Sequence, residues 1–339
     1  MLVIVLTLEA ASCGDVRVDP FSPAGPNATG GASCPSSMVG YATVAGPSTP
    51  TTGGGAVASV TVTALDQLMA YASSAEPAVI VVQGMIAIPT GSQPLQVEIQ
   101  SNKTIVGADA QSGVTGGGFI VDGTDNVIIQ NLVVSSPVGT DAVTVQSAQH
   151  VWIDHCEFFS DTTHSTSYYG WLVNIKHATD YVTVSWSKFH DHFNTVQIGH
   201  SDSNGAEDMG HLTVTLHHNS FVGTWSGTPR VRFGYVHPFN NHYQTVMDYA
   251  VASQDGAQVL VERDVFDAVA IPLTNTHEMT PPGALGDVMN RYSTDSGANV
   301  LAATGGPAFT FATPPYTYVA DSPDSVPAVV AACAGPGAM

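Results

Sequence analysis

The chain has 339 residues, of which 44% are hydrophobic and 11% are charged, so it is long and apolar enough to bury a large core. Only eight Lys and Arg residues stand against 28 Asp and Glu residues, which gives a formal net charge of −20 and excludes nucleic acid as a partner, because phosphate binding requires clustered basic residues. Frequent Gly (33) and Pro (21) favour strands and turns over helices.

The amino-terminal residues 1–13 form a short apolar run that ends in small residues and Cys13. The run is too short to cross a bilayer and predicts an export signal, with Cys13 in a loose match to a bacterial lipoprotein cleavage site. No other stretch is long and apolar enough to span a membrane. Residues 14–38 are rich in Pro, Gly, Ser and Thr and are expected to form a flexible spacer. We therefore expect a secreted protein or one anchored to lipid through Cys13.

Three further cysteines differ in their sequence surroundings. Cys34 and Cys333 lie near opposite ends of the part expected to be ordered, and they could pair in an oxidising compartment. Cys156 lies in an apolar strand pattern, which favours a buried small side chain. No CxxC pair occurs, so neither a zinc ribbon nor a dithiol redox site is indicated.

A short helix is predicted at about residues 64–73, between the strand candidates Val57–Val62 and Val79–Val82. Thr63 and Asp66 are close to a capping-box pattern. Apolar residues recur on one face of the segment: Leu65, Leu68, Met69 and Ala72. We expect this helix to cover the open end of the fold.

From about residue 100 the sequence repeats, with a period of roughly 22 residues that insertions lengthen. Each repeat has a small or polar residue after a strand pattern: Asn131, Cys156, Ser187, Asn219, Asn241 and Asp264. Two positions later stands an apolar or aromatic residue: Val133, Phe158, Phe189, Phe221, Tyr243 and Phe266. This self-similarity indicates a solenoid, with an aromatic stack inside, a polar ladder at one turn, and insertions that wall a groove. Residues 270–339 lose the period and are expected to form an irregular extension, either packed along the outside or partly loose.

Two of the eight basic residues, Arg230 and Arg232, stand in the segment Thr228–Gly234. In a strand, period-two alternation would place both guanidinium groups on one face. They would form a small cationic strip that could hold an acidic ligand, which the rest of the surface would repel. This strip is the first candidate for a functional centre.

Seven segments, in this order, resemble the pectate lyase / pectin lyase family over roughly residues 39–270. They are Ser101–Gly107, Val151–His155, Phe189–His192, Ile198–Asn204, Thr228–Gly234, Val236–Tyr243 and Gly256–Glu262. The resemblance implies an all-β fold, a right-handed single-stranded parallel β-helix over residues 39–339. It also implies β-elimination on pectin-type galacturonan by a monomeric polysaccharide lyase.

The calcium site that the resemblance implies is largely replaced in this sequence. Asp141 matches one ligand, while three other acidic positions hold Gly139, Gly170 and Asn174. Calcium takes roughly six to eight oxygen ligands, so Asp141 alone is not a calcium site. We therefore expect no required cofactor, and Asp141 is a candidate substrate contact instead.

The cationic positions are also altered. Lys176 matches a substrate-binding lysine, and Arg232 matches an arginine that contacts the substrate carboxylate. A second lysine position holds Asn194, and the arginine regarded as the base falls on Gly227. Arg230 could supply the missing guanidinium, or it could pair with surface carboxylates.

Aromatic residues lie in the loops expected to wall the cleft: Tyr168, Tyr169, Trp171, Phe193 and Trp225. With the net charge, they favour a neutral or partly esterified substrate over polygalacturonate. Asp154 and His155 are expected to serve the scaffold on the opposite face, and the other histidines lack metal spacing and are interpreted as solvated or hydrogen-bonded. Three functions stay open: a calcium-independent lyase, a binding protein that kept the groove and lost the base, and an enzyme acting on another uronate or neutral glycan.

Overall fold

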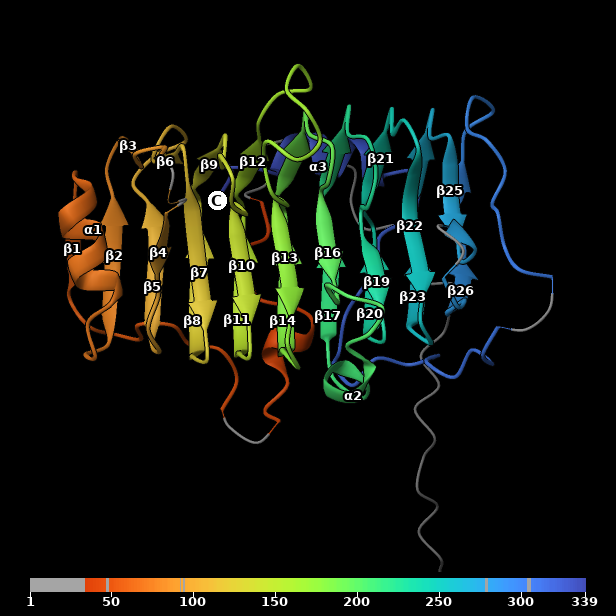
Figure 1. Cartoon of the computed structure of the whole chain (residues 1–339), viewed down its shortest axis with the longest axis horizontal. Coiled ribbons are helices and arrows are strands. Elements are labelled where there is room, and N and C mark those ends of the chain that lie inside the picture. Colours follow the sequence, from red (N-terminus) through yellow and green to blue (C-terminus); the bar gives the residue numbers. More distant parts are fainter. Residues whose placement is uncertain (1–33, 47–48, 92, 94, 278–279, 304–305) are drawn as a thin grey trace, which may run out of the picture. The chain divides into compact units, whose positions relative to one another are not determined.

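Three short strands recur in each coil of the chain, and each strand joins a different parallel sheet (Figure 1). The computed structural model describes residues 34–46, 49–91, 93, 95–277, 280–303 and 306–339. The predicted export signal, Cys13 and residues 14–33 of the predicted spacer lie outside these ranges. Within them, the predicted parallel β-solenoid is confirmed.

The three sheets are continuous ladders along the solenoid. The ten-stranded sheet contains β1 (Ser59–Val62), β2 (Ala78–Val82), β5 (Lys103–Gly107), β8 (Asp125–Gln130), β11 (Gln149–Asp154), β14 (Asp180–Ser185), β17 (Thr213–His217), β20 (Tyr235–Phe239), β23 (Gln258–Glu262) and β26 (Ala284–Val288). The eight-stranded sheet contains β4 (Gln96–Glu98), β7 (Gly118–Asp122), β10 (Val143–Gln146), β13 (Val173–Lys176), β16 (Val196–Ile198), β19 (Arg230–Arg232), β22 (Tyr249–Gln254) and β25 (Ile271–Thr274). The nine-stranded sheet contains β3 (Met85–Ala87), β6 (Gly113–Thr115), β9 (Val133–Ser135), β12 (Glu157–Phe159), β15 (Lys188–His190), β18 (Ser220–Val222), β21 (His242–Gln244), β24 (Val265–Asp267) and β27 (Arg291–Tyr292).

The predicted aromatic stack runs through the core. Ring centroids are 5.1 Å apart between Phe158 and Phe189, and 4.8 Å apart between Phe189 and Phe221. The stack continues through Tyr243 and Phe266 at 5.0 and 4.7 Å. Because equivalent residues of successive coils face one another, each coil buries the apolar face of the next.

The predicted polar ladder also forms, at the turn that follows the ten-stranded sheet. The Asn219 and Asn241 backbone amides donate to the side-chain oxygens of Asn241 and Asp264, over 3.0 and 2.6 Å. Ser187 N donates in the same way to Asn219 Oδ1. These bonds satisfy backbone amides at a turn that has no other local partner for them.

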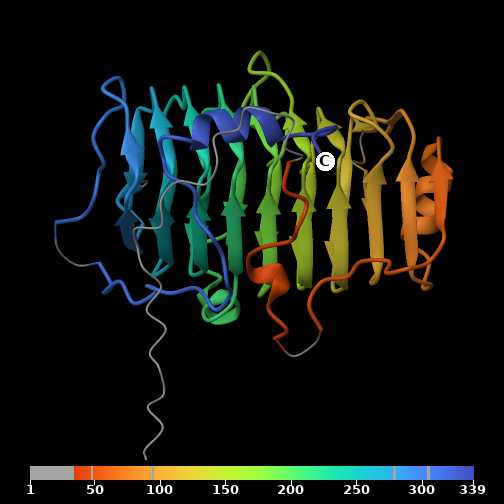
Figure 2. The same cartoon turned by 180° about the vertical axis from the view of Figure 1, so that it is seen from behind.

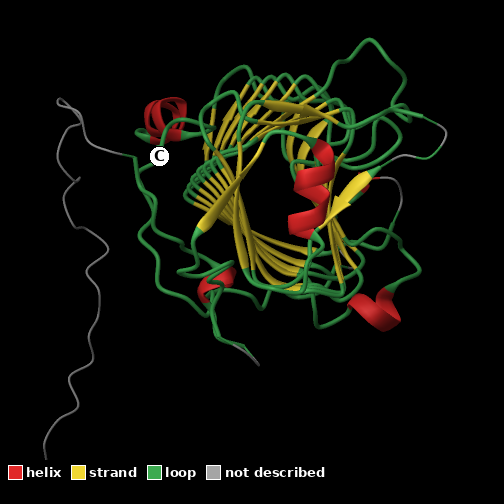
Figure 3. Cartoon of the chain, turned by 90° about the vertical axis from the view of Figure 1, so that its left-hand side faces the viewer, coloured by secondary structure: helices red, strands yellow, loops and turns green. Residues whose placement is uncertain are grey.

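Helix α1 (Leu65–Ala72) lies across the amino-terminal end of the solenoid, as predicted, and its Leu68 and Ala72 join the core (Figure 3). The predicted capping box is wrong. The N-cap residue is Ala64, without a side-chain cap, and the Thr63 amide instead donates to Gln67 Oε1 over 3.0 Å. The other short helices are η1 (Tyr41–Thr43), α2 (Gly205–Asp208) and α3 (Val326–Cys333). None of the helices among the described residues is long and apolar enough to cross a membrane.

The coils continue past residue 270, where the sequence predicted the irregular extension to begin. Strands β25, β26 and β27 pair with the three sheets, up to Tyr292. The chain then returns along the outside of the solenoid to α3 (Figure 2), whose Val326 and Val330 pack against Val265. Of the two arrangements left open for the extension, packing along the outside describes this part.

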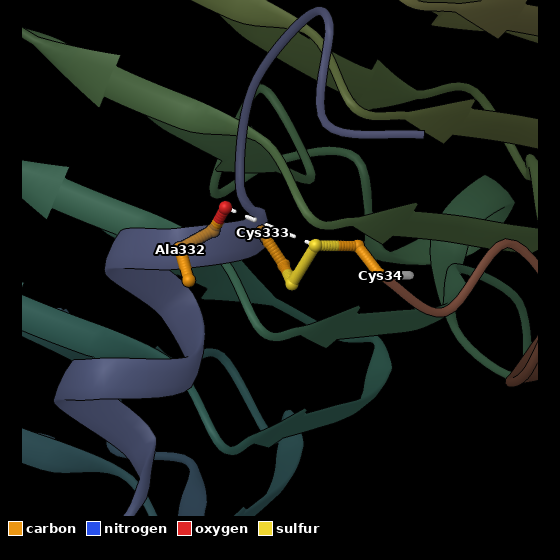
Figure 4. The surroundings of a disulfide bond; sticks show 3 residues. All are labelled: Cys34, Ala332 and Cys333. Carbon is orange, nitrogen blue, oxygen red and sulfur yellow. Dashed lines mark hydrogen bonds between the residues drawn. A yellow bond between two sulfur atoms is a disulfide. The ribbon is translucent and has the colours of Figure 1, made fainter. Parts of the chain in front are cut away.

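A disulfide joins Cys34 to Cys333 across 299 sequence positions (Figure 4). The expected pairing is therefore present, and it ties the first described residue to the end of α3. Cys156 is free and buried, as its apolar surroundings predicted.

Candidate active site

The outer face of the eight-stranded sheet carries polar side chains in rows that cross the strands. Alternation sends residues such as Val173 and Ile175 into the core and their neighbours outward. Strand register aligns four outward residues in one row: Thr144, Asn174, Gln197 and Arg230. Two pairs of outward residues lie two positions further along the strands: Gln146 with Lys176, and Arg232 with Gln254. The predicted placement of Arg230 and Arg232 on one face of a strand agrees with this register.

Asp141 is the hydrogen-bonding centre of this face. Its Oδ1 accepts from the Trp171 backbone amide over 2.7 Å, and its Oδ2 accepts from Thr144 Oγ1 and Asn174 Nδ2, both over 2.9 Å. Both carboxylate oxygens are therefore already engaged by the protein. Asp141 holds the start of β13 in place.

The residues present do not fit a calcium ion. The neighbouring positions Gly139 and Gly170 carry no side-chain oxygen. Position 174 holds an asparagine in place of a second carboxylate, and its amide donates to Asp141. In the part of the chain that the structure describes, no cluster of three or more His, Cys, Asp or Glu residues is arranged to hold a metal. Calcium needs roughly six to eight oxygen ligands, which this face does not supply.

Gly227 lies against the indole of Trp171. A Cβ atom built on Gly227 would lie 2.8 Å from Trp171 Cζ3, and Gly227 has a φ of 69°, where L side chains are strained. The position at which the resemblance expects an arginine base therefore has no side chain. The Trp171 ring occupies the space beside it.

Arg232 is buried, with 5% of its surface exposed, and its charge is neutralised inside the protein. Its Nε bonds to Asp202, and its Nη1 donates to the Gly199 carbonyl over 2.9 Å. Asp255 Oδ2 lies 3.6 Å from the same Nε, and burial together with the nearby Asp202 charge raises the pKa of Asp255. This geometry makes Arg232 an anchor for the turn after β16 and leaves it poorly placed for the substrate contact expected of it.

Arg230 is half-buried and lies in the polar row beside Gln197. Its Nε donates to Gln254 Oε1 over 2.9 Å. Arg230 is less buried than Arg232 and is therefore more accessible from the outer face.

Several polar groups on β13 and β16 lack partners. Lys176 and Gln197 form no side-chain hydrogen bond or ion pair with any described residue, although Gln197 is only 7% exposed. Asn174 Oδ1 is buried without a partner. Buried polar groups are normally hydrogen-bonded, so the unpaired groups of Asn174 and Gln197 indicate a surface whose partners come from a ligand or water.

The aromatic residues predicted to wall the cleft differ in exposure. Trp225 is 46% exposed, with its ring centroid 5.8 Å from that of Phe193, and Tyr168 is 40% exposed and stacks on His164 at 4.1 Å. Tyr169 is buried, and its hydroxyl donates to Asp161 over 2.6 Å.

Burial and the Asp161 charge raise the pKa of Tyr169 to about 12, so it stays protonated. Tyr169 therefore braces its loop, while Trp171 and Trp225 stand where the chain enters β13 and approaches β19.

Asp154 and His155 are completely buried on the ten-stranded sheet and its turn. Asp154 Oδ2 lies 2.7 Å from His155 Nδ1, and Asp154 Oδ1 accepts from Ser185 Oγ over 2.6 Å. These contacts support the scaffold role predicted for the pair.

Three residues at or near the outer face were not singled out from the sequence as site residues. Gln197 could have been found from the alternation of Val196 and Ile198, which sends it outward. His200 follows the turn at Gly199, where alternation no longer predicts direction. Asp202, the partner of Arg232, lies in the segment Ile198–Asn204, but no local pattern indicates its pairing with Arg232.

Comparison with known proteins agrees with this fold. The family model described as pectate lyase matches residues 28–335. The probable pectate lyase A of Aspergillus flavus is 41% identical over 208 residues, 61% of this chain and 63% of that protein. The pectate lyase A of Aspergillus niger is 40% identical over 230 residues, 63% of this chain and 71% of that one. That of Aspergillus fumigatus, a probable pectate lyase A, is 36% identical over 73% of this chain and 74% of its own length.

Solved structures are similar over almost the whole solenoid. A pectate lyase from Bacillus sp. N165, in complex with trigalacturonate, is 27% identical, with a TM-score of 0.72 over 89% of this chain and 99% of that one. The thermostable pectate lyase PL 47 is 22% identical, with the same TM-score over 90% and 98%. The match to the Aspergillus flavus protein spans less than two thirds of that protein's length, whereas the family model covers most of this chain. The chain belongs to the pectate lyase family.

Proposed function

We propose that this protein cleaves pectin-type galacturonan by β-elimination on the outer face of the eight-stranded sheet, without calcium. Two observations on β13 and β16 carry the proposal: Asn174 Oδ1 is buried without a partner, and the Lys176 and Gln197 side chains form no hydrogen bond or ion pair with the described residues. The relatives are pectate lyases, which supports the reaction class, and the similar Bacillus structure is a complex with trigalacturonate.

In the proposed reaction a base removes the proton on C5 of the uronate. The C–H electron pair forms the C4–C5 double bond, and the bond from C4 to the glycosidic oxygen breaks. The C5 proton becomes acidic only when the C6 carboxyl group is neutralised or polarised, which needs positive charge close to it. Lys176 on β13 and Arg230 on β19 are the proposed sources of this charge, with Gln197 on the strand between them.

The other predicted site residues take supporting roles in this proposal. Asp141 fixes Asn174 and the start of β13 through its three hydrogen bonds. Arg232 holds the turn after β16. Trp171 and Trp225 offer apolar surface to sugar rings.

A partly methyl-esterified pectin is the proposed substrate. A formal charge of −20 repels a uniform polyanion from most of the surface, and Lys176 and Arg230 neutralise at most two carboxylates. Esterified residues carry no charge and suit the exposed Trp225.

A second candidate function is pectin binding without cleavage. It is favoured by one observation, the glycine at position 227 packed against Trp171. The chain would then keep the groove of its family and lack the base.

Ultraviolet absorbance of the unsaturated uronate product tests the two functions. Citrus pectin and polygalacturonate are each incubated with the protein in calcium and in EDTA. Product on pectin in EDTA is expected. If no substrate gives product, the lyase proposal fails, and retention on insoluble pectin then separates pectin binding from action on another glycan.

We further propose that the protein is exported and monomeric. The Cys34–Cys333 disulfide supports an oxidising compartment. Light scattering tests the monomer, and the distribution between membrane and medium fractions of a Cys13→Ala variant tests lipid attachment.

A further inference from the structure

His200 stands beside Lys176 at the end of β16. Ile175 pairs with Ile198, and the Gly199 amide donates to the Ile175 carbonyl over 2.9 Å, so Lys176 lies level with Gly199. The next residue is His200. Gly199 has a φ of 81°, which turns the chain away from strand geometry at this point.

Arg232 stabilises the turn that carries His200. Its Nη1 donates to the Gly199 carbonyl, and its Nε bonds to Asp202. The buried guanidinium therefore binds the turn at residues before and after His200. A cation that is neutralised and buried is of little use to a substrate carboxylate. It is well suited to fixing a neighbouring side chain in place.

The His200 ring has no hydrogen-bond partner among the described residues. Its Nδ1 is buried and unpaired, and its nearest aromatic contact is His177, with ring centroids 4.4 Å apart. His177 in turn faces Glu207, with Nδ1 3.0 Å from Oε2. Because Nδ1 is buried and Nε2 is not, Nε2 is the ring nitrogen that can meet a substrate.

The charges around His200 act in the same direction as its burial. Burial lowers the pKa of His200 below its ordinary value, and the nearby His177 and Lys176 lower it further. Asp208 and Glu207 offset part of this effect. The balance leaves a neutral imidazole, able to accept a proton, next to a lysine that has no partner.

No arginine is placed to act as the base at position 227, because that position is a glycine whose space is taken by Trp171. Arg230 is a poor proton acceptor, since the guanidinium pKa lies above about 12. The proposed elimination therefore needs another base near Lys176. His200 is the neutral titratable group that the turn after β16 brings to this position.

We propose, on the basis of the proposed lyase function, that His200 is the catalytic base of this protein. With the Nδ1 proton directed inward, Nε2 takes the C5 proton of the uronate that Lys176 holds by its carboxyl group. The C–H electron pair becomes the C4–C5 double bond, the C4–O bond breaks, and the leaving oxygen takes a proton from water. The imidazolium then releases its proton to solvent, which restores the base.

The proposal is tested with His200→Gln and with His211→Gln as the matched control, because the His211 ring is already paired with Asp180, with Nδ1 2.6 Å from Oδ2. His200→Gln is expected to lower kcat on pectin about 100-fold, with KM changed by less than about threefold, the scale of a lost general base. His211→Gln is expected to keep kcat within about twofold. Thermal unfolding of both variants shows whether each is folded.

The pH profile gives a readout that a structural role would not move. In the wild-type protein, kcat/KM is expected to fall on the acid side as His200 is protonated, with its midpoint below the ordinary histidine value of 6.5. This acid limb is expected to disappear in His200→Gln, and added imidazole is expected to restore part of the rate of His200→Ala.

Three outcomes bear on the proposal. A folded His200→Gln variant with nearly wild-type kcat overturns the role of His200 and leaves the lyase function intact. An acid limb that persists unchanged in that variant does the same. A wild-type protein that forms no unsaturated product from any uronate polymer overturns the lyase function and the base together.

Discussion

Trp171 and Gly227 are packed as a pair: a Cβ atom on Gly227 would lie 2.8 Å from Cζ3 of the Trp171 ring. The Trp171 backbone is fixed in turn by Asp141, which accepts its amide proton over 2.7 Å. The absence of a side chain at position 227 and the large ring at position 171 therefore depend on each other. Restoring an arginine at 227 is not a simple reversal of one substitution.

Gly227→Arg is expected to destabilise the protein by about 2–4 kcal/mol and to raise no lyase activity, because it combines an unfavourable φ with a clash against Trp171. Trp171→Ala in the same chain is expected to recover part of that loss, so the two changes are non-additive. Urea denaturation of the wild type, both single variants and the double variant measures this coupling.

Gly223→Arg is the matched control for this cycle. Gly223 also has a positive φ, 61°, and a Cβ atom there would meet only Asp191 Oδ1, at 3.8 Å. Its substitution is expected to cost about 1 kcal/mol, the backbone term alone. Equal losses for the two glycine variants would show that the Trp171 contact has no energetic weight.

Lys176→Ala is expected to weaken substrate binding with little change in stability, because the ammonium group has no partner among the described residues. A lost charge-assisted hydrogen bond corresponds to roughly a tenfold rise in KM. The rise is expected to be larger on polygalacturonate than on esterified pectin, where fewer carboxylates compete for the charge.

Lys188→Ala is the comparison, since Lys188 lies on the outer face of the nine-stranded sheet. Initial rates on both polymers give the KM values. A KM that changes no more for Lys176→Ala than for Lys188→Ala would remove Lys176 from the proposed site.

The fold was predictable from the sequence because its signal repeats. Phe158, Phe189 and Phe221 stand at equivalent places in successive coils, so an error in one strand does not change the architecture. The site was less predictable because its contacts join different coils. Asp202 neutralises Arg232 from 30 positions away, and nothing in the local pattern of either residue announces the pairing.

The same limit applies at residue 227. The sequence shows that the expected arginine is a glycine, whereas the reason lies in Trp171, which the preceding coils bring against it. Alternation correctly placed Arg230 and Arg232 on one face, but the two side chains differ in burial. Arg230 is half-buried, whereas Arg232 is only 5% exposed. Sequence periodicity predicts direction, while burial depends on the loops that fold over the sheet.

Asp141→Ala is expected to lower the free energy of unfolding by about 1–3 kcal/mol, because Trp171 N, Thr144 Oγ1 and Asn174 Nδ2 lose a charged acceptor. Calcium and EDTA are expected to leave the Tm and the rate on pectin of the wild-type protein unchanged. A Tm that rises with calcium in the wild type, and not in Asp141→Ala, would instead assign a metal to this carboxylate.

Asp264 is the carboxylic acid in the polar ladder. It is completely buried, and its Oδ1 accepts from the Asn241 amide over 2.6 Å, while Asn290 Oδ1 accepts from the Asp264 amide over 2.8 Å. Burial raises the pKa of Asp264 well above its ordinary value of 3.8. The folded state therefore binds the Asp264 proton more tightly than the unfolded state does.

Because of this raised pKa, the Asp264 contribution to stability falls as the pH rises above about 4, where the unfolded chain releases the proton and the folded chain retains it. Asp264→Asn keeps the shape and the acceptor oxygen without the charge. It is expected to be more stable than the wild type by on the order of 1 kcal/mol at pH 7, with the difference shrinking toward pH 4. Urea denaturation across this range measures it, with Asp122→Asn, at an exposed position of β7, as the control. A wild-type advantage that grows toward pH 7 would mean that the ladder binds Asp264 as the carboxylate.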